Sequence, residues 1–318
     1  MPFAAAAALA AACGGRTELS AAGAAADACD GTAEELELPA GVAPPLAGCS
    51  APLPVPRGKA WIGSFRFDAQ GRLSPIDACE PPWHQVVARR VVVRGFFVDR
   101  DEVANACYRH CVEAGWCAPP PEFPELPHVP GPWTDPALQD HPVHADFARA
   151  AILCAWRGGR LPTLAELVRA SHGDEPSVCK PELLRAWVDC FWSSFESAGC
   201  QALERRATGF EPIRSYAADI GPFGHYDLFG ARDEISATRA PSTAAEAGAL
   251  CALDNDMPDP KSLGTSTISV QFGPAMGLYI SQWLIEDPEG GSISNAQVDP
   301  FDELPELRGF RCAYDPVR

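Results

Sequence analysis

The stretch from Ala145 to Gly173 reads ADFARAAILCAWRGGRLPTLAELVRASHG, and it predicts two consecutive helices. In the first helix, apolar residues recur at helical spacing and form a face that we expect to be buried: Phe147, Ala150, Ala151 and Cys154. Gly158 and Gly159 end this helix. After Pro162, Thr163 and Glu166 form a Thr-x-x-Glu capping box that starts the second helix. One face of that second helix carries Leu164, Leu167, Val168 and Ser171.

Three further blocks accompany CAWRGGRLPTLAEL (154–167): FFVDRDEVANACYRHCVEAG (96–115), GPFGHYDLFGARDEI (221–235) and RGFRCA (308–313). In this order the four blocks resemble those of the formylglycine-generating enzyme (sulfatase-modifying factor) family. The resemblance covers about residues 55 to 316. It implies an α+β fold of the C-type-lectin-like kind, rich in loops, with two or three helices and small, mainly antiparallel sheets.

Composition restricts the classes of partner. The chain has 42 acidic and 25 basic residues, which gives a formal net charge of −17. This charge repels phosphate backbones and argues against nucleic acid, and against an anionic membrane surface as an electrostatic partner. The 32 prolines are about twice the usual share, which indicates irregular connecting structure.

The N-terminal segment resembles a bacterial lipoprotein signal. Residues 1–12, MPFAAAAALAAA, lead directly into Cys13, which such a signal leaves as a lipidated N-terminus. Because no basic residue precedes the apolar run, the alternative is a disordered alanine-rich tail. Residues 14–54 are rich in Ala, Gly and Pro, which is typical of a tether. We therefore expect a signal over 1–13, a tether over 14–54 and the family domain over 55–318. The protein would be exported to the cell envelope (periplasmic or outer surface) and would meet the membrane only through its lipid.

The cysteines support export. There are 13, so 12 remain after Cys13, an even number that suits an oxidising compartment. Cys107 and Cys111 are one helical turn apart, too far for a disulfide, and Cys111 has Cys117 just past the turn instead. The family resemblance implies a second pair, Cys154 with Cys312. Pairing stays open for Cys29, Cys49, Cys79, Cys107, Cys179, Cys190, Cys200 and Cys251.

The resemblance also implies a reaction that this sequence does not support. The family's enzymes oxidise a substrate cysteine with O₂, using copper(I) held by two cysteine thiolates. Thiolates are the soft ligands that copper(I) selects. The matching segment here, residues 267–307, contains no cysteine, and Cys251 stands alone. We therefore expect that the chain binds no copper. We expect it to serve as a binding or structural module, with an unidentified protein, peptide or glycan as its ligand. The alternative is an active oxidoreductase of the same family.

Two candidate sites remain. In the family an Asn and a nearby Glu hold structural calcium; here Ala231 takes the Asn position and Glu234 keeps the other. The loss of one oxygen ligand weakens a calcium site without abolishing it, and the neighbouring Arg232 opposes the ion. No other cofactor is expected. The segment that matches the family's peptide groove carries large side chains, which either line a ligand surface or pack inward as core: Phe272, Met276, Tyr279 and Trp283.

Overall fold

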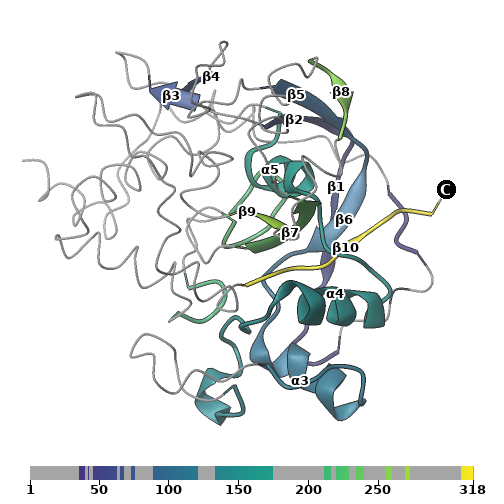
Figure 1. The fold of residues 1–318 in the computed structure, drawn as a ribbon, viewed down its shortest axis with the longest axis vertical. Helices are drawn as coiled ribbons and strands as arrows, with labels where there is room; N and C mark the ends of the chain where they lie inside the picture. Colours follow the sequence, from purple (N-terminus) through teal and green to yellow (C-terminus); the bar gives the residue numbers. More distant parts are fainter. Residues whose placement is uncertain are drawn as a thin grey trace, which may run out of the picture.

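The computed structural model of the protein describes part of the chain. The described residues are 36–39, 42, 46–62, 65–67, 73–75, 89–120, 133–174, 211–215, 220–228, 234–239, 255–259, 269–272 and 309–317. Within them the fold is α+β, with short helices and small sheets of two or three strands (Figure 1).

A long, bent pair of antiparallel segments runs through the molecule (Figure 1). One side consists of β1 (Pro52–Val55) and β2 (Gly58–Ile62), and the other of β5 (Arg89–Val93) and β6 (Phe96–Asp99). β1 pairs with β6 and β2 with β5, and two residues on each side separate the paired regions. We call this pair of segments the ribbon.

Each half of the ribbon gains one more strand. β10 (Ala313–Tyr314) pairs antiparallel with β6, and β8 (Met257–Pro258) pairs parallel with β5. Two further pairs are antiparallel: β3 (Phe65–Phe67) with β4 (Leu73–Pro75), and β7 (Glu234–Arg239) with β9 (Ser269–Phe272). The sheets are thus mainly antiparallel, as expected.

In the described part of the chain, three α-helices pack on this frame: α3 (Asn105–Glu113), α4 (Phe147–Trp156) and α5 (Leu164–His172). A short 3-10 turn, η1, covers Pro136–Leu138. Gly115 and Gly158 follow the ends of α3 and α4 with positive φ, the conformation that favours glycine after a helix. The capping box of α5 is confirmed, since Thr163 accepts from the backbone N–H of Glu166 while the Glu166 side chain accepts from that of Thr163. No helix in the described part of the chain is long and apolar enough to cross a membrane.

The apolar side chains form two clusters. The first lies between α5 and the inner face of the β2–β5 half of the ribbon, and includes Ala60, Ile62, Val91, Val93, Leu164 and Leu167. The second joins α3, α4 and the C-terminal segment, and includes Cys107, Tyr108, Leu153, Cys154, Phe310 and Cys312. Segments from both ends of the chain therefore meet in one core.

One expectation about helix faces was wrong in detail. Phe147 is 39% exposed, because it is the first residue of α4 and the buried face runs through Ala150, Leu153 and Cys154 instead. In α5 the expected face of Leu164, Leu167, Val168 and Ser171 is buried, and so is the rest of the helix. Its charged side chains stay inside because each has an ion partner: Glu166 contacts Arg160 at 2.7 Å, and Arg169 contacts Asp174 at 2.8 Å.

The described structure also begins before residue 55, where we expected the domain to start. β1 starts at Pro52, and residues 46–50 already contact α3. Pro52 and Pro54 alternate along β1, so both nitrogens face the same side of the strand. β1 is an edge strand of its sheet, and an edge strand tolerates proline on its unpaired side. The proline-rich composition that indicated a tether is therefore compatible with this strand.

Candidate functional site

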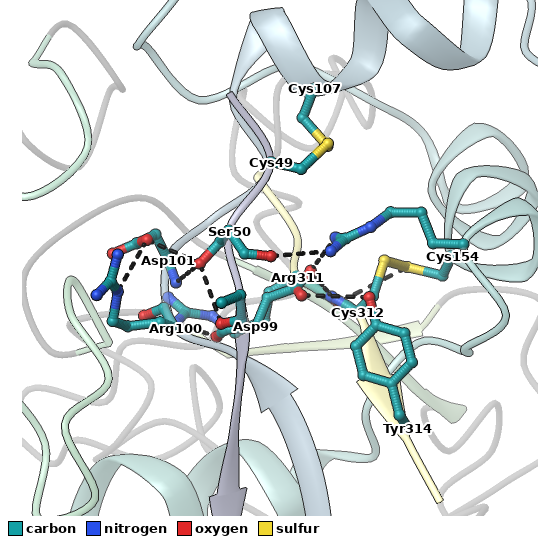
Figure 2. Close-up of polar contacts among 12 residues, drawn as sticks. Cys49, Ser50, Asp99, Arg100, Asp101, Cys107, Cys154, Arg311, Cys312 and Tyr314 are labelled. Atoms are coloured by element: carbon teal, nitrogen blue, oxygen red, sulfur yellow. Dashed lines mark hydrogen bonds and ion pairs between the residues drawn. A yellow bond between two sulfur atoms is a disulfide. The ribbon is translucent and has the colours of Figure 1, made fainter. Parts of the chain in front are cut away.

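A group of charged side chains joins parts of the chain that are far apart in sequence (Figure 2). Asp99 and Asp101 lie at the end of β6, where the apolar run Phe96–Val98 stops. Ser50 comes from the segment before β1, and Arg157 caps the C-terminal end of α4. We call the whole group the polar cluster, and it consists of Ser50, Asp99, Asp101, Arg157, Arg214, Glu234 and Arg311.

Asp99 is completely buried and lies at the centre of the polar cluster. Its Oδ2 accepts from Arg157 Nη1 at 2.5 Å and from the backbone N–H of Cys312 at 3.1 Å, and its Oδ1 accepts from the Tyr314 hydroxyl at 3.2 Å. Burial raises the pKa of Asp99, while Arg157 and the other donors oppose that rise. Burial also raises the pKa of Tyr314, and Asp99 raises it further. The carboxylate thus joins α4 to the C-terminal segment.

Arg311 makes the most extensive contacts in the polar cluster. Its Nε lies 2.8 Å from both carboxylate oxygens of Glu234, and its Nη2 lies 2.5 Å from Oε1. The remaining donors bind backbone carbonyl oxygens of Asp99, Arg100 and Tyr226. Neither Arg311 nor Glu234 is exposed by more than 1%. Burial alone would lower the pKa of Arg311, but the charge of Glu234 raises it overall.

Asp101 is held at the edge of the polar cluster. Both of its oxygens accept from Arg214, and Oδ2 also accepts from the Ser50 hydroxyl at 2.8 Å. Burial raises the pKa of Asp101, but the hydrogen bonds from Arg214 and Ser50 outweigh it and lower the pKa overall. Arg214 itself adopts a positive φ of 64°, and its backbone N–H donates to Asp227 at 2.5 Å. That hydrogen bond holds an otherwise unfavourable conformation in place.

Two buried histidines are neutral at physiological pH. Burial lowers the pKa of His225 to about 3, and the positive charge of Arg311 contributes to this. Burial lowers the pKa of His172 to about 3 as well. Among the described residues, every carboxylate of the polar cluster has a guanidinium partner. The arrangement therefore fixes segments in place and does not present a free acid or base to a substrate.

The described residues contain three disulfides, and two of them adjoin the polar cluster. Cys154 is bonded to Cys312 and Cys111 to Cys117, which are the two pairs named from the sequence. The third, Cys49 with Cys107, involves residues whose pairing had stayed open. It attaches residues 46–50 to α3 and so places Ser50 beside Asp101 and Arg157. Figure 2 shows this bridge above the group and the Cys154–Cys312 bridge at its right.

Comparison with known families agrees with this architecture. The sequence-family model described as the sulfatase-modifying factor enzyme 1-like domain matches residues 52–276, which is more than half of the chain. The chain belongs to that family. A search among curated proteins found no match. The matched region begins at the first residue of β1, and the sulfatase-modifying factor domain has the C-type-lectin-like fold.

The surroundings of Glu234, the residue considered as a possible calcium ligand, do not favour a metal ion in the described part of this sulfatase-modifying factor domain. Both carboxylate oxygens of Glu234 already contact the guanidinium of Arg311, and a fixed positive charge at that distance opposes a second cation. The described residues include no group of three or more His, Cys, Asp or Glu side chains that could hold a metal ion. Ala231 and Arg232 lie outside the described residues.

The other sequence-predicted positions fall largely outside the described part of the sulfatase-modifying factor domain. Phe272 is the last residue of β9, where it pairs with Glu234. Met276, Tyr279, Trp283 and Cys13 lie outside the described residues. Sequence reasoning did not identify the polar cluster. One sequence pattern could have indicated it, namely charged residues that directly follow or interrupt an apolar run. Examples are Asp99 and Asp101 after Phe96–Val98, and Arg311 within GFRCA.

Proposed function

We propose that this chain is an exported, lipid-anchored sulfatase-modifying factor protein that has lost the copper oxidase site and serves as a binding or structural module. The observation that carries the proposal is the absence of any cysteine between Cys251 and Cys312 in the sequence. A copper(I) site of the family's type needs two thiolates, and thiolates are the ligands that this ion selects.

The disulfides support the same proposal. Cys312 is the first cysteine after Cys251, and its sulfur is bonded to Cys154. Cys111, Cys117, Cys49 and Cys107 are bonded in pairs as well, so the described cysteines offer no thiolate to a metal. Disulfides are also consistent with an exported protein. Cys13, which follows the apolar N-terminal run, would carry the lipid.

Turnover of a cysteine peptide tests the loss of the oxidase site. The full chain is incubated with copper(I), O₂ and a peptide that carries a sulfatase-type cysteine motif, and formylglycine is measured by mass spectrometry. We expect none, and we expect a copper titration to show no thiolate-to-copper absorption. Formylglycine formed at a rate that one substitution in this chain abolishes would establish the alternative, an active oxidoreductase of the same family.

Anchoring has a separate test. Metabolic labelling with a fatty acid in a bacterial host is expected to label the chain and not its Cys13→Ser variant. Label that persists in the variant would contradict the assignment of Cys13, whatever the outcome of the peptide assay.

We propose the segment with Phe272, Met276, Tyr279 and Trp283 as the ligand surface of the module. Large aromatic side chains provide apolar area together with a polar group, which suits recognition of a peptide or glycan. Acrylamide should quench the Trp283 fluorescence readily, and Trp283→Ala should leave the melting temperature nearly unchanged. A loss of about 3 to 5 kcal/mol in the free energy of unfolding would show that Trp283 belongs to the core instead.

A further inference from the structure

The outward side of the β2–β5 half of the ribbon carries basic and aromatic side chains. The side chains of Ala60 and Ile62 in β2, and of Val91 and Val93 in β5, are buried in the cluster beneath α5. Because side chains alternate along a strand, the opposite side carries Lys59, Trp61, Arg90 and Val92. Lys59 is 41% exposed and Arg90 is 36% exposed.

Two more arginines face each other where the ribbon bends. Gly58 pairs with Val93 on one side of the bend and Val55 with Phe96 on the other, with two residues between them on each strand. The register therefore continues through the bend and places Arg57 opposite Arg94. Both are exposed, and neither guanidinium makes a hydrogen bond or ion pair with any residue that the structure describes.

This placement costs stability. Like charges directly opposite each other on paired strands are destabilising, and no acidic side chain in the described part of the chain pairs with Arg57 or Arg94. One described acidic side chain reaches the neighbouring pair: Asp256 lies 3.0 Å from Lys59 Nζ and 3.5 Å from Arg90 Nε. The Arg90 guanidinium also lies 5.6 Å from the centre of the Trp61 ring. We call Arg57, Lys59, Trp61, Arg90 and Arg94 the basic face.

The basic face carries a local positive excess although the whole chain is acidic. Among the described residues, the side chains of its four cations form ion pairs with one carboxylate, that of Asp256. Asp174 accepts from the backbone N–H of Lys59, but its charge is balanced by Arg169. Exposed charges interact over a screening distance of about 8 Å at physiological salt. The face therefore attracts an anion that approaches it, even though the net charge of the chain is −17.

The N-terminal segment leaves the fold beside this face. Leu36 packs at the bend, since a Cβ atom added to Gly95 would lie 3.1 Å from Leu36 Cδ2 and 3.5 Å from the Arg57 backbone nitrogen. Twenty-three residues separate Cys13 from Leu36, and a chain of that length reaches at most about 75 to 85 Å. A lipid on Cys13 would thus hold the basic face within reach of the membrane surface.

We propose that the basic face rests on an anionic phospholipid surface and so orients the domain on the membrane that carries its anchor. Arginine binds phosphate oxygens with two parallel N–H donors. Trp61 is partly buried, with its indole nitrogen inside, so its ring supports the Arg90 guanidinium and does not itself offer a donor to the headgroups. The orientation rests on the proposed lipid anchor, but the contact between the face and the lipid headgroups does not require it.

Vesicle binding by a non-acylated protein tests this contact. The full chain with Cys13→Ser is sedimented with vesicles of phosphatidylcholine alone, or with about 30% phosphatidylglycerol. We expect binding to the second kind, lost as salt rises. Each basic residue near an anionic membrane contributes about a 5-fold change in affinity, so Arg57→Gln/Arg94→Gln should weaken binding by about 20-fold or more.

A matched control removes two arginines from elsewhere. Arg109→Gln/Arg149→Gln makes the same charge change on α3 and α4, at the opposite end of the molecule from β2 and β5 (Figure 1), and should leave binding within about 2-fold of the parent. Equal effects of the two double variants would show that net charge alone matters and would overturn the proposal. Equal binding to both kinds of vesicle would overturn it as well.

Poly-glutamate distinguishes a lipid surface from an acidic polypeptide. If poly-glutamate binds the chain and phosphatidylglycerol vesicles do not, the face recognises an acidic protein segment and the proposal is wrong. These binding assays use the non-acylated chain, so their results do not depend on whether Cys13 carries a lipid. Vesicle binding that depends on Arg57 and Arg94, combined with failure of fatty-acid labelling at Cys13, would contradict the proposed anchor and leave the basic face as a lipid-binding surface.

Discussion

At the scale of single residues, ion pairs without access to water hold the C-terminal segment in place. Arg311 contacts Glu234 and three backbone carbonyl oxygens, and Asp99 receives donors from Arg157, Cys312 and Tyr314. A charge in such a place is tolerated only while its partner is present. The polar cluster is therefore sensitive to changes that remove one member of a pair.

Glu234→Gln should be strongly destabilising. It leaves the guanidinium of Arg311 buried without a counter-charge, which costs about 3 to 5 kcal/mol in the free energy of unfolding. Urea unfolding of the full chain measures this. The control is Asp315→Asn, because Asp315 also pairs with an arginine, Arg160, but is 72% exposed, and its loss should cost at most about 1 kcal/mol. Equal costs for the two variants would contradict the account.

Sequence reasoning identified the segments that carry these residues but not the pairs. GFRCA and the block that contains Glu234 were both singled out, yet the only role considered for Glu234 was that of a possible calcium ligand. A carboxylate in a loop motif suits a metal ion and a guanidinium equally well. Only the position of Arg311, 77 residues further along the chain, decides between them.

At the scale of elements, the segment 46–50 acts as an arm attached to α3. Cys49 is bonded to Cys107, the carbonyl oxygen of Ala47 contacts His110 at 2.9 Å, and Gly48 lies directly against Ala106. Gly48 has a φ of 78°, and an added Cβ would lie 2.6 Å from that of Ala106, so no larger residue fits there. The arm delivers both the carbonyl and the hydroxyl oxygen of Ser50 to the polar cluster.

Removal of the arm's disulfide should cost more than removal of the short one. In the chain-entropy model the Cys49–Cys107 bridge, with a separation of 58 residues, contributes about 4 kcal/mol, and Cys111–Cys117, with a separation of 6, about 2 kcal/mol. We expect Cys49→Ala/Cys107→Ala to lower the free energy of unfolding about twice as far as Cys111→Ala/Cys117→Ala. Thermal unfolding compares the two, and the reverse order would refute the arm's role.

The elements were predictable where local chemistry specifies them. The capping box at Thr163 and the glycine after α4 belong to their own turns, and the structure has them as expected. β1 was missed because Pro52 and Pro54 argue against a strand until its position at a sheet edge is known. The exposed Phe147 was missed because a buried face depends on where the neighbouring helix lies.

At the scale of the whole molecule, the balance of protons links stability to pH. His172 and His225 are buried, with pKa values lowered to about 3. In the unfolded chain a histidine has a pKa near 6.5, so between about pH 6.5 and pH 3 the unfolded state binds more protons. Stability should therefore fall as the pH decreases through this window, with each histidine contributing up to about 1.4 kcal/mol per pH unit.

Urea unfolding at a series of pH values tests this dependence. His225→Gln should make the decline shallower than in the parent chain, although the variant is less stable at pH 7. The control is His110→Gln, because the His110 side chain is about one-third exposed, and its curve should run parallel to that of the parent. Parallel curves for all three proteins would show that His225 is not a source of the acid sensitivity.

The overall fold could be predicted from the sequence most completely, and the ligand could be predicted least. Four blocks in order specified the family, and its model matches residues 52–276. The basic face was not predictable, because the net charge of −17 describes the chain and not one side of a ribbon. Arg57 and Arg94 face each other only through the register that β1, β2, β5 and β6 share.

The place of Arg311, Cys312 and Tyr314 in the core also constrains when the protein folds. These residues follow every other described element in the sequence, yet they complete the sheet beside β6, the buried ion pair with Glu234 and the bridge to Cys154. From Trp156 at the end of α4 to Arg311 the chain adds 155 residues, which takes about 8 to 30 s at about 5 to 20 residues per second. β6 and α4 are therefore synthesised well before the segment that completes their packing, and this part of the core can close only once residues 311–314 have been made.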